Sequence, residues 1–320
     1  MLSNDQRRKF FKQAGALALG SILLPSCSSP QNQQSNNGAA SQPSPPKGDI
    51  SPIGVQLYSV RDVIEGDLQG TLQQLANMGY QEVESYPGQQ GGHYFGMEPQ
   101  AFSSMLQDMG MKLVSGHIAT GNRSGDNQQT TTPWQQATLL SGFDAFVEKA
   151  AESGQTYVTC SWMDESLRQT PDDLKSTAEL FNQIGQRCKD VGLQFAYHNH
   201  AFEYEKVGDS MIYGFMLENT DPDLVQWELD MYWVVAGGQN PVEYLQKYPN
   251  RFPLGHVKDM DKQDHERNTE LGKGSIDYTR ILKVAKEQGM KHFLVEQETY
   301  TSSSIESVKE DYEYLSQLAV

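Results

Sequence analysis

The residues of this 320-residue chain that can bind a metal or move a proton recur after short β-type runs. His198 and His200 stand in YHNH, and Asp230 closes the run ELD. His256 lies in GHVKD, and Glu296 lies in LVEQE. Two imidazoles and two carboxylates suit Mn²⁺, Zn²⁺, Co²⁺ or Fe²⁺ better than Ca²⁺. The pattern predicts that His198, Asp230, His256 and Glu296 bind one divalent cation, whose identity stays open.

Each of these residues also has an ordinary structural interpretation. A single histidine at a strand end is more often hydrogen-bonded support, and Asp230 can be the N-cap of a following helix. Lys258 can belong to a surface pair with Asp259, and Glu296 can be a salt-bridge partner. The convergence at successive strand ends favours the metal site, because buried imidazoles and carboxylates are costly unless they are paired or bind a cation.

The elements that must position these residues alternate between strand and helix patterns. We expect strands at Ile53–Tyr58, Gln81–Ser85, Lys112–Ile118, Tyr157–Ser161, Gln194–His198, Leu224–Asp230, Leu254–Lys258 and His292–Glu296. We expect helices at Leu68–Met78, Phe102–Met109, Trp134–Ser153, Pro171–Val191, Pro241–Tyr248, Tyr278–Gln288 and Ser304–Ala319, with one short pattern at Ser210–Leu217. The residues that follow a helix and precede a strand, as helix C-caps do, are Gly79, Gly110, Gly154, Gly192 and Gly289.

Eight strand–helix units in roughly 270 residues predict an α/β fold, a (β/α)₈ TIM barrel. The alternative is a doubly wound open sheet, but no glycine-rich dinucleotide loop follows the first strand. In a barrel the chemistry lies at the C-terminal ends of the strands. We therefore predict that Glu84 and His117, at the second and third strand ends, bind the substrate.

The N-terminal segment is predicted to direct export and to lie outside the fold. Residues 1–26 resemble a signal peptide of the twin-arginine and lipoprotein type, with Arg7 and Arg8 before the uncharged stretch Ala14–Leu24. This stretch is too short for a spanning helix, which needs about 20 apolar residues. The sequence LPSC, ending at Cys27, resembles a lipobox and predicts lipidation there, with the protein anchored to a membrane and facing the periplasm or cell exterior. A disordered basic N-terminus is the alternative.

The remaining chain is divided by composition. Residues 27–49 are rich in Ser, Gln, Asn and Pro and are predicted to form a disordered linker, and residues 50–320 to form the catalytic domain. The chain carries 41 acidic and 25 basic residues, a formal charge of −16. Such a surface repels phosphate backbones, so we expect no nucleic-acid partner. Three cysteines do not make a disulfide scaffold.

Several motifs together resemble the xylose isomerase-like TIM-barrel superfamily of sugar isomerases and epimerases. They are IGVQLYSVRD at 53–62, GYQEVESY at 79–86, AYHNHAFEY at 196–204, ELDMYW at 228–233, GHVKDMD at 255–261, ELGKGSIDY at 270–278 and FLVEQE at 293–298. The resemblance implies one divalent metal held by an acidic residue after the fifth strand and by Asp230, His256 and Glu296. His198 departs from this pattern, because many relatives have Glu at its position.

The resemblance also implies proton transfer at a carbon next to a carbonyl, usually by two carboxylates. Glu296 is the predicted base, and Lys258 a predicted electrostatic partner of the enediolate. With His198 in place of one carboxylate, His200 or Glu203 is the candidate for the second acid or base. A solvated loop charge is an equal interpretation of Glu203. Trp162 and Trp233 are predicted to pack against a sugar ring.

These inferences predict a metal-dependent isomerase or epimerase of a non-phosphorylated sugar. One alternative is a lyase that cleaves 3-keto-glycosides by elimination, and another is a non-catalytic carbohydrate-binding lipoprotein. The endonuclease branch of the superfamily needs a basic DNA-binding face, which the acidic composition argues against.

Overall fold

The computed structural model describes residues 48–89, 91–121 and 132–320. Eight parallel strands close into a barrel in the order β1-β12-β9-β8-β5-β4-β3-β2, which confirms the predicted (β/α)₈ fold. The strands are β1 (Ile53–Gln56), β2 (Glu82–Ser85), β3 (Lys112–Ala119), β4 (Tyr157–Trp162), β5 (Gln194–His198), β8 (Val225–Asp230), β9 (Leu254–Val257) and β12 (His292–Val295). Predicted signal residues and Cys27 lie outside the described residues.

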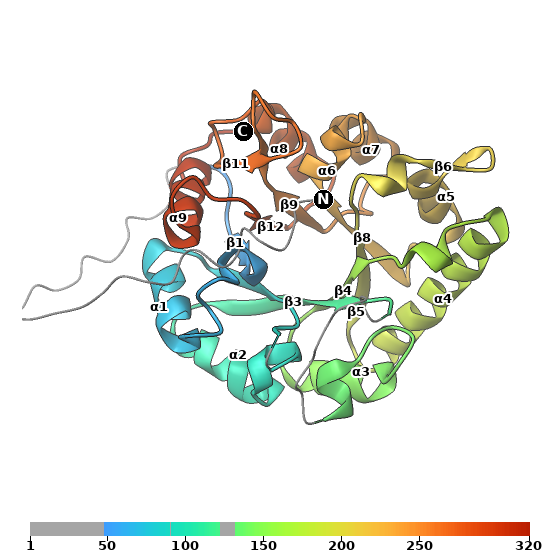
Figure 1. The fold of residues 1–320 in the computed structure, drawn as a ribbon, viewed down its shortest axis with the longest axis horizontal. Coiled ribbons are helices and arrows are strands. Elements are labelled where there is room, and N and C mark those ends of the chain that lie inside the picture. The colour runs from blue at the N-terminus through green and yellow to red at the C-terminus, as the bar shows by residue number, and fades with distance from the viewer. Residues whose placement is uncertain (1–47, 90, 122–131) are drawn as a thin grey trace, which may run out of the picture. The chain divides into compact units, whose positions relative to one another are not determined.

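Helices surround the strands of the barrel (Figure 1). They are α1 (Leu68–Met78), α2 (Pro99–Asp108), α3 (Phe143–Glu152), α4 (Pro171–Asp190), α5 (Ile212–Asn219), α6 (Met231–Ala236), α7 (Pro241–Lys247), α8 (Tyr278–Glu287) and α9 (Ser304–Leu315). Within the described residues, no helix combines the length and apolar character needed to cross a bilayer. The five predicted C-cap glycines all have positive φ, between 72° and 112°.

The expected helix at Trp134–Ser153 is wrong in its first half. Pro133–Gln136 forms a short 3₁₀ helix, and an isolated bridge joins Thr138 to Ser141. Gly142 then adopts φ 72°, so α3 begins only at Phe143. Ala137 and Leu139 are buried without belonging to a helix, and the apolar pattern of the sequence cannot distinguish this from a helix.

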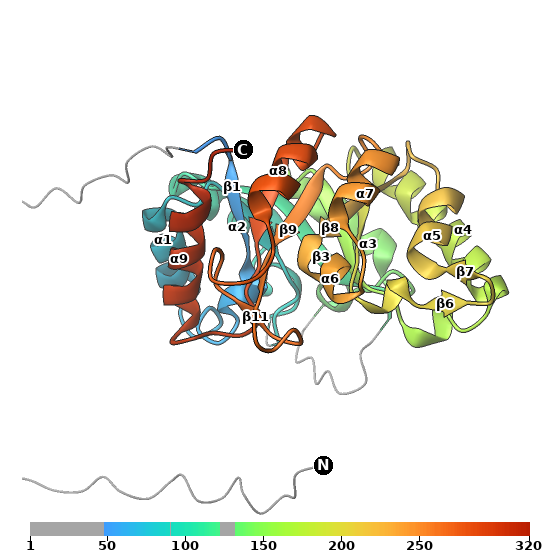
Figure 2. The same ribbon diagram turned by 90° about the horizontal axis from the view of Figure 1, so that it is seen from above.

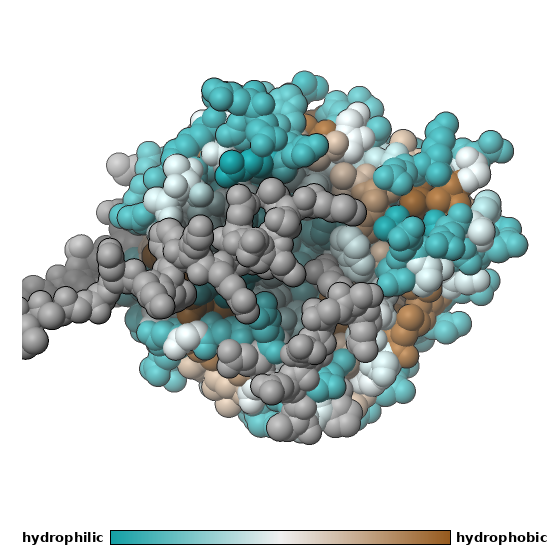
Figure 3. All heavy atoms as spheres, viewed as in Figure 1, coloured by the Kyte–Doolittle hydropathy of each residue, from teal (hydrophilic) through white to brown (hydrophobic). Residues whose placement is uncertain are grey.

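Two short hairpins extend the C-terminal ends of the strands. The β6–β7 pair (Lys206–Val207 and Ser210–Met211) follows β5, and the β10–β11 pair (Asp259–Met260 and Asn268–Thr269) follows β9. Both lie toward the lower edge of Figure 2, which marks this edge as the mouth where a TIM barrel carries its site. Hydrophilic residues predominate on the described part of this face in Figure 3.

Inside the barrel, side chains form layers from apolar to ionisable. A small apolar cluster fills the interior of the barrel at the end away from the mouth: Val114, Tyr157, Ala196, Leu254 and Leu294. The next inward positions toward the mouth carry charge instead, as in β8, where Glu228 and Asp230 share a face because strand side chains alternate. The outward residue between them, Leu229, packs in the main core under the helices. The two-residue period therefore delivers polar groups to the interior while the barrel wall stays apolar.

Candidate active site and metal centre

Four side chains from successive strand ends meet in the barrel mouth. His198 ends β5, Asp230 ends β8, His256 lies in β9, and Glu296 follows β12; all four are buried. One potential ligand atom from each lies within 4.8 Å of those of the other three. Nε2 of His198 is 3.4 Å from Oδ2 of Asp230, and Nδ1 of His256 is 3.2 Å from Oε2 of Glu296. The structure therefore brings the predicted donor set together.

Asp230 serves the local fold and the site with different oxygens. Its Oδ1 accepts a hydrogen bond from the Trp233 amide at 2.8 Å and caps α6, the role that an ordinary reading assigns to it. Oδ2 faces His198 instead. The Asn199 side chain bonds to both the N–H and the C=O of Asp230, which fixes the strand end.

Lys258 places a fully buried ammonium beside these carboxylates. Its Nζ lies 2.7 Å from Oε2 of Glu296, 3.2 Å from Oδ2 of Asp230 and 2.5 Å from Oε1 of Glu298. Burial lowers the pKa of Lys258, but the three carboxylates outweigh it and raise that pKa well above its usual value. Burial likewise opposes ionisation of Glu296, yet Lys258 and then His256 hold the Glu296 pKa well below its usual range. Lys258 is therefore part of the centre, and the surface-pair interpretation is wrong.

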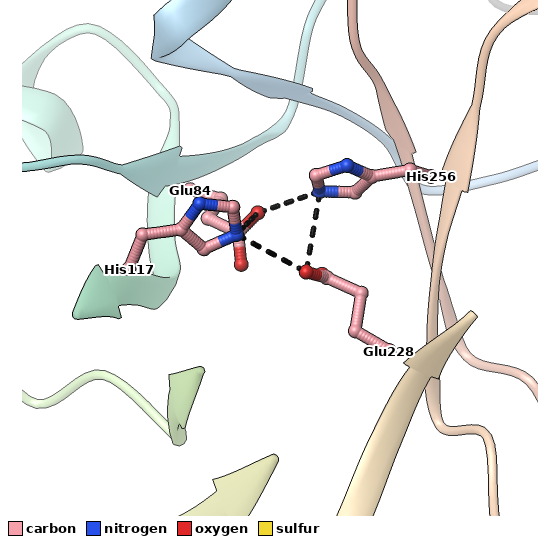
Figure 4. A group of neighbouring side chains, drawn as sticks. All are labelled: Glu84, His117, Glu228 and His256. Atoms are coloured by element: carbon pink, nitrogen blue, oxygen red, sulfur yellow. Dashed lines mark hydrogen bonds and ion pairs between the residues drawn. The ribbon is translucent and has the colours of Figure 1, made fainter. Parts of the chain in front are cut away.

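A second group of ionisable side chains lies deeper in the barrel than the donor set and contacts His256 (Figure 4). Oε2 of Glu84 lies 2.7 Å from Nε2 of His256 and 2.9 Å from Nε2 of His117. Oε2 of Glu228 lies 3.3 Å and 3.1 Å from the same two nitrogens. Gln56 donates a third hydrogen bond to Glu84 at 2.8 Å. His256 thus belongs to both groups, through Nδ1 above and Nε2 below.

Glu84 is buried deeper in the barrel than the cavity and does not line it, so its predicted contact with a substrate is not seen. The arrangement gives Glu84 a different role. A ligating histidine usually donates its second ring N–H to a carboxylate, which fixes the tautomer. With Nε2–H directed to Glu84, His256 would bind a cation of the upper group through Nδ1.

The donor set fits a divalent cation by both chemistry and charge. Burial and then the charge of His256 hold the pKa of His198 well below its usual value, so its ring is neutral and has a lone pair to give. Burial opposes the charge of His117, but Glu84 and then Glu228 raise its pKa to about 9. Burial also opposes the charge of His256, but Glu228 and then Glu296 raise its pKa well above its usual value. Four buried carboxylates, those of Glu84, Glu228, Asp230 and Glu296, therefore carry a formal −4 against +3 from Lys258, His117 and His256. A divalent cation that replaced the proton on Nδ1 of His256 would bring this sum to zero.

A cavity of about 1110 Å³ opens above this centre. Predicted substrate contacts His117, Trp162 and Trp233 line it, as do Glu296 and the half-buried His200. The His200 ring lies 4.8 Å from that of His198 and 5.2 Å from that of Trp162. Two buried ring nitrogens on this wall have no hydrogen-bond partner in the described part of the chain: Nδ1 of His200 and Nε1 of Trp233.

Glu203 is another predicted site residue that does not line the cavity. It is buried, so the solvated-loop interpretation is wrong. Its carboxylate accepts hydrogen bonds from the Tyr197 hydroxyl at 2.6 Å and the His200 amide at 2.8 Å, and it does not line the cavity. Tyr197 points outward from β5, whereas His198 points inward. Burial raises the pKa of Glu203 to about 7.

Two residues of the site, Glu228 and Arg61, were not predicted from the sequence. Glu228 precedes Asp230 by two residues in ELD, so period-two alternation could have placed it inside the barrel. Arg61 lines the cavity from the segment after β1 and has no comparable signal. Cys160 and Cys188 are free and buried, and burial raises the pKa of each thiol to about 12, so neither is a nucleophile.

Comparisons with known proteins agree with the fold and the motifs. The family model described as the xylose isomerase-like TIM barrel matches residues 72–318. The chain therefore belongs to the xylose isomerase-like TIM-barrel family.

Among curated relatives, an inosose dehydratase from Lacticaseibacillus casei is 23% identical over 266 residues, which cover 77% of this chain and 87% of the relative. A crystal structure described as a sugar phosphate isomerase/epimerase from Parabacteroides distasonis is 30% identical, with a TM-score of 0.68 over 82% of this chain and 93% of that one. The IolI protein, whose structure has a bound zinc atom, shares the fold at 16% identity, with a TM-score of 0.64 over 82% of this chain and 95% of that one.

Proposed function

We propose that the protein is a metal-dependent enzyme of the sugar isomerase and epimerase type, which removes a proton α to a carbonyl of a non-phosphorylated sugar. The observation that carries this proposal is the contact between Glu296, a carboxylate in the cavity wall, and both a metal-type donor set and the buried Lys258. His198, Asp230, His256 and Glu296 would hold the cation. When bound, a divalent cation supplies positive charge that stabilises an enediolate.

The protein's own groups account for the proton transfer. Glu296 is ionised, because Lys258 and His256 keep its pKa low, and it accepts the α-proton. The Lys258 ammonium is buried and does not line the cavity, so it acts on this step through its ion pair with Glu296, which it keeps ionised. His200 lines the same cavity, its Nδ1 has no hydrogen-bond partner among the described residues, and we assign it as the second acid or base. Glu203 does not reach the cavity and has no part in this step.

The cavity's charge supports a substrate without phosphate. Of the described residues that line it, Arg61 is the single lysine or arginine, whereas Asp62, Glu65, Glu296 and Glu298 are acidic. A phosphate group would be repelled by this wall and would find few donors.

Elimination is a second candidate outcome of the same first step. Its support is the asymmetry of the site, which sets one ionised carboxylate against a neutral imidazole, together with the similarity to inosose dehydratases. After Glu296 takes the α-proton, the C–O bond at the β-carbon breaks, and the electron pair of the former C–H bond forms the new double bond. The oxygen leaves with the C–O pair and takes up the proton that Glu296 has removed, which gives water, or an alcohol if the substrate is a 3-keto-glycoside.

The test is incubation of metal-loaded protein with free sugars and 3-keto-glycosides in D₂O. Solvent deuterium at one substrate carbon is expected, and the product distinguishes isomerisation from elimination. Glu296→Gln should slow exchange by about 10²–10⁴-fold, the usual loss for a missing general base. Exchange at the wild-type rate in Glu296→Gln would remove Glu296 from the mechanism. No exchange with any sugar would leave a carbohydrate-binding protein.

We also propose that the protein is exported and lipid-anchored at Cys27. The support is sequence alone: Arg7 and Arg8, the uncharged stretch Ala14–Leu24 and the cysteine after it. Cys27→Ser expressed in a lipoprotein-processing host should release the protein from membranes or leave it uncleaved. Unchanged membrane partition would refute acylation at this residue.

A further inference from the structure

The cavity continues past the metal-type donor set toward the segments after β1 and β2. One part of its wall is formed by Trp162, His200, Trp233 and Glu296. Another part, which follows β1 and β2, is formed by Tyr58, Arg61, Glu65 and Tyr86, and we call it the outer site. At about 1110 Å³ the cavity exceeds the roughly 300–1,000 Å³ typical of pockets for drug-sized ligands. One sugar ring with its reacting carbon at Glu296 leaves the outer site unfilled.

Aromatic rings of the outer site are held in a fixed arrangement. The rings of Tyr58 and Tyr86 meet edge to face with centroids 5.3 Å apart, and Phe95 packs against the other side of Tyr86 at 5.4 Å. Tyr94 and Phe95 both adopt left-handed backbone conformations, with φ of 57° and 54°. Such conformations are rare for bulky residues and tend to gather at ligand sites. The turn thus keeps the Tyr86 ring at the cavity wall.

The outer site also offers hydrogen-bonding groups of both kinds. The Tyr86 hydroxyl is buried and has no hydrogen-bond partner among the residues that the structure describes. Arg61 donates to the carbonyls of Tyr58 and Glu298 and to the Tyr300 hydroxyl, and within the described parts of the chain no carboxylate forms an ion pair with it. Glu65 adds carboxylate oxygens to the same wall. Donors and acceptors beside aromatic rings match a sugar ring, which has hydroxyls at its edge and C–H groups on its faces.

Arg61 connects the outer site to the reaction centre. Its Nη2 donates to the Glu298 carbonyl at 2.7 Å, and the Glu298 carboxylate lies 2.5 Å from the Lys258 ammonium. A ligand that contacts Arg61 therefore lies against the same strand end that carries Glu296. Both parts of the cavity can be occupied by one molecule.

We propose that the outer site binds a second sugar unit linked to the reacting one, so that the substrates are disaccharides or longer saccharides. This rests on the proposed function for the identity of the first unit. A glycosidic oxygen joins the second ring directly to the first, so one molecule can occupy both parts of the continuous cavity.

The test is calorimetric titration of the metal-loaded full chain with glucose, galactose and xylose and with cellobiose, lactose and xylobiose. At least one disaccharide is expected to bind ten-fold or more tightly than its constituent monosaccharides. Tyr86→Phe keeps the ring and removes the partnerless hydroxyl, so it should weaken that disaccharide about three- to ten-fold and leave monosaccharide binding unchanged. Tyr204→Phe, in a buried tyrosine outside the cavity, is the matched control and should change neither.

Two results would overturn the outer site. One is that no disaccharide binds more tightly than its constituents, including no binding at all; the other is that the gain survives both Tyr86→Phe and Tyr58→Ala. Deuterium exchange separates this from the proposed function. Loss of exchange with every sugar while the disaccharide preference persists refutes the enzyme and keeps the outer site, and the reverse pattern refutes the outer site alone.

Discussion

Replacing Glu84 by Gln should weaken metal binding although Glu84 contacts no metal. Its Oε2 receives hydrogen bonds from Nε2 of His256 at 2.7 Å, Nε2 of His117 at 2.9 Å and Nε2 of Gln56 at 2.8 Å. Gln keeps the size and one oxygen but removes the charge and presents an NH₂ group to one of these donors. His256 then loses the partner that directs its Nδ1 lone pair upward. Losses for such outer partners are typically 10–100-fold, or about 1.4–2.8 kcal/mol.

The assay is competition for Zn²⁺ and Mn²⁺ between metal-free protein and a chelating dye. Glu82→Gln is a matched control, because Glu82 lies two residues earlier on β2, also points inward and pairs with His292 at 2.8 Å, away from the donor set. Thermal unfolding of both variants separates loss of metal from loss of fold. Wild-type affinity in Glu84→Gln, or an equal loss in Glu82→Gln, would refute the reasoning.

Three further predictions concern the same region. Asp230→Ala and His256→Ala should each lose bound metal by elemental analysis, and full occupancy in both would eliminate the site. His200→Ala should retain metal but lose turnover, and an unchanged rate would leave the second acid or base unassigned. Burial raises the Glu203 pKa from 4.5 to about 7, so its contribution to stability is present below pH 4.5 and lost as pH rises through 7. The free energy of unfolding of Glu203→Gln should therefore rise relative to the wild type between pH 5 and 8, by about 3 kcal/mol at most in chemical unfolding. The exposed Glu205→Gln should show no such rise. Parallel plots of unfolding free energy against pH for Glu203→Gln and the wild type would contradict the burial argument.

Local rules were sufficient to predict the strands and the upper donor set. Positive-φ glycines such as Gly79 and Gly289 mark helix ends, and the strand after each one supplies a side chain to the mouth. His198, Asp230, His256 and Glu296 could be grouped because parallel strands end at the same edge.

Depth and direction could not be predicted from the same rules. Glu84 and Asp230 both lie near strand ends, yet the stagger of the strands around the barrel places Glu84 one layer deeper, on the side of His256 away from the mouth. Glu203 follows β5 closely, but a 3₁₀ turn at Phe202–Tyr204 folds it back toward Tyr197, outside the barrel. Both outcomes depend on contacts between distant segments.

The resemblance to the family predicts an acidic ligand where this chain has His198, and the difference would change the charge of the proposed centre. With a cation bound, two deprotonated imidazoles and two carboxylates would balance its charge, whereas one imidazole and three carboxylates would leave the set at −1. Lys258 adds a further positive charge beside Glu296, and it also forms an ion pair with the half-buried carboxylate of Glu298. A centre balanced in this way has more positive potential available for an oxyanion on the substrate than one with a third carboxylate. In the proposed mechanism the same difference leaves Glu296 without a matching carboxylate base, so we expect the site to stabilise the enediolate better but to treat the two faces of the sugar unequally.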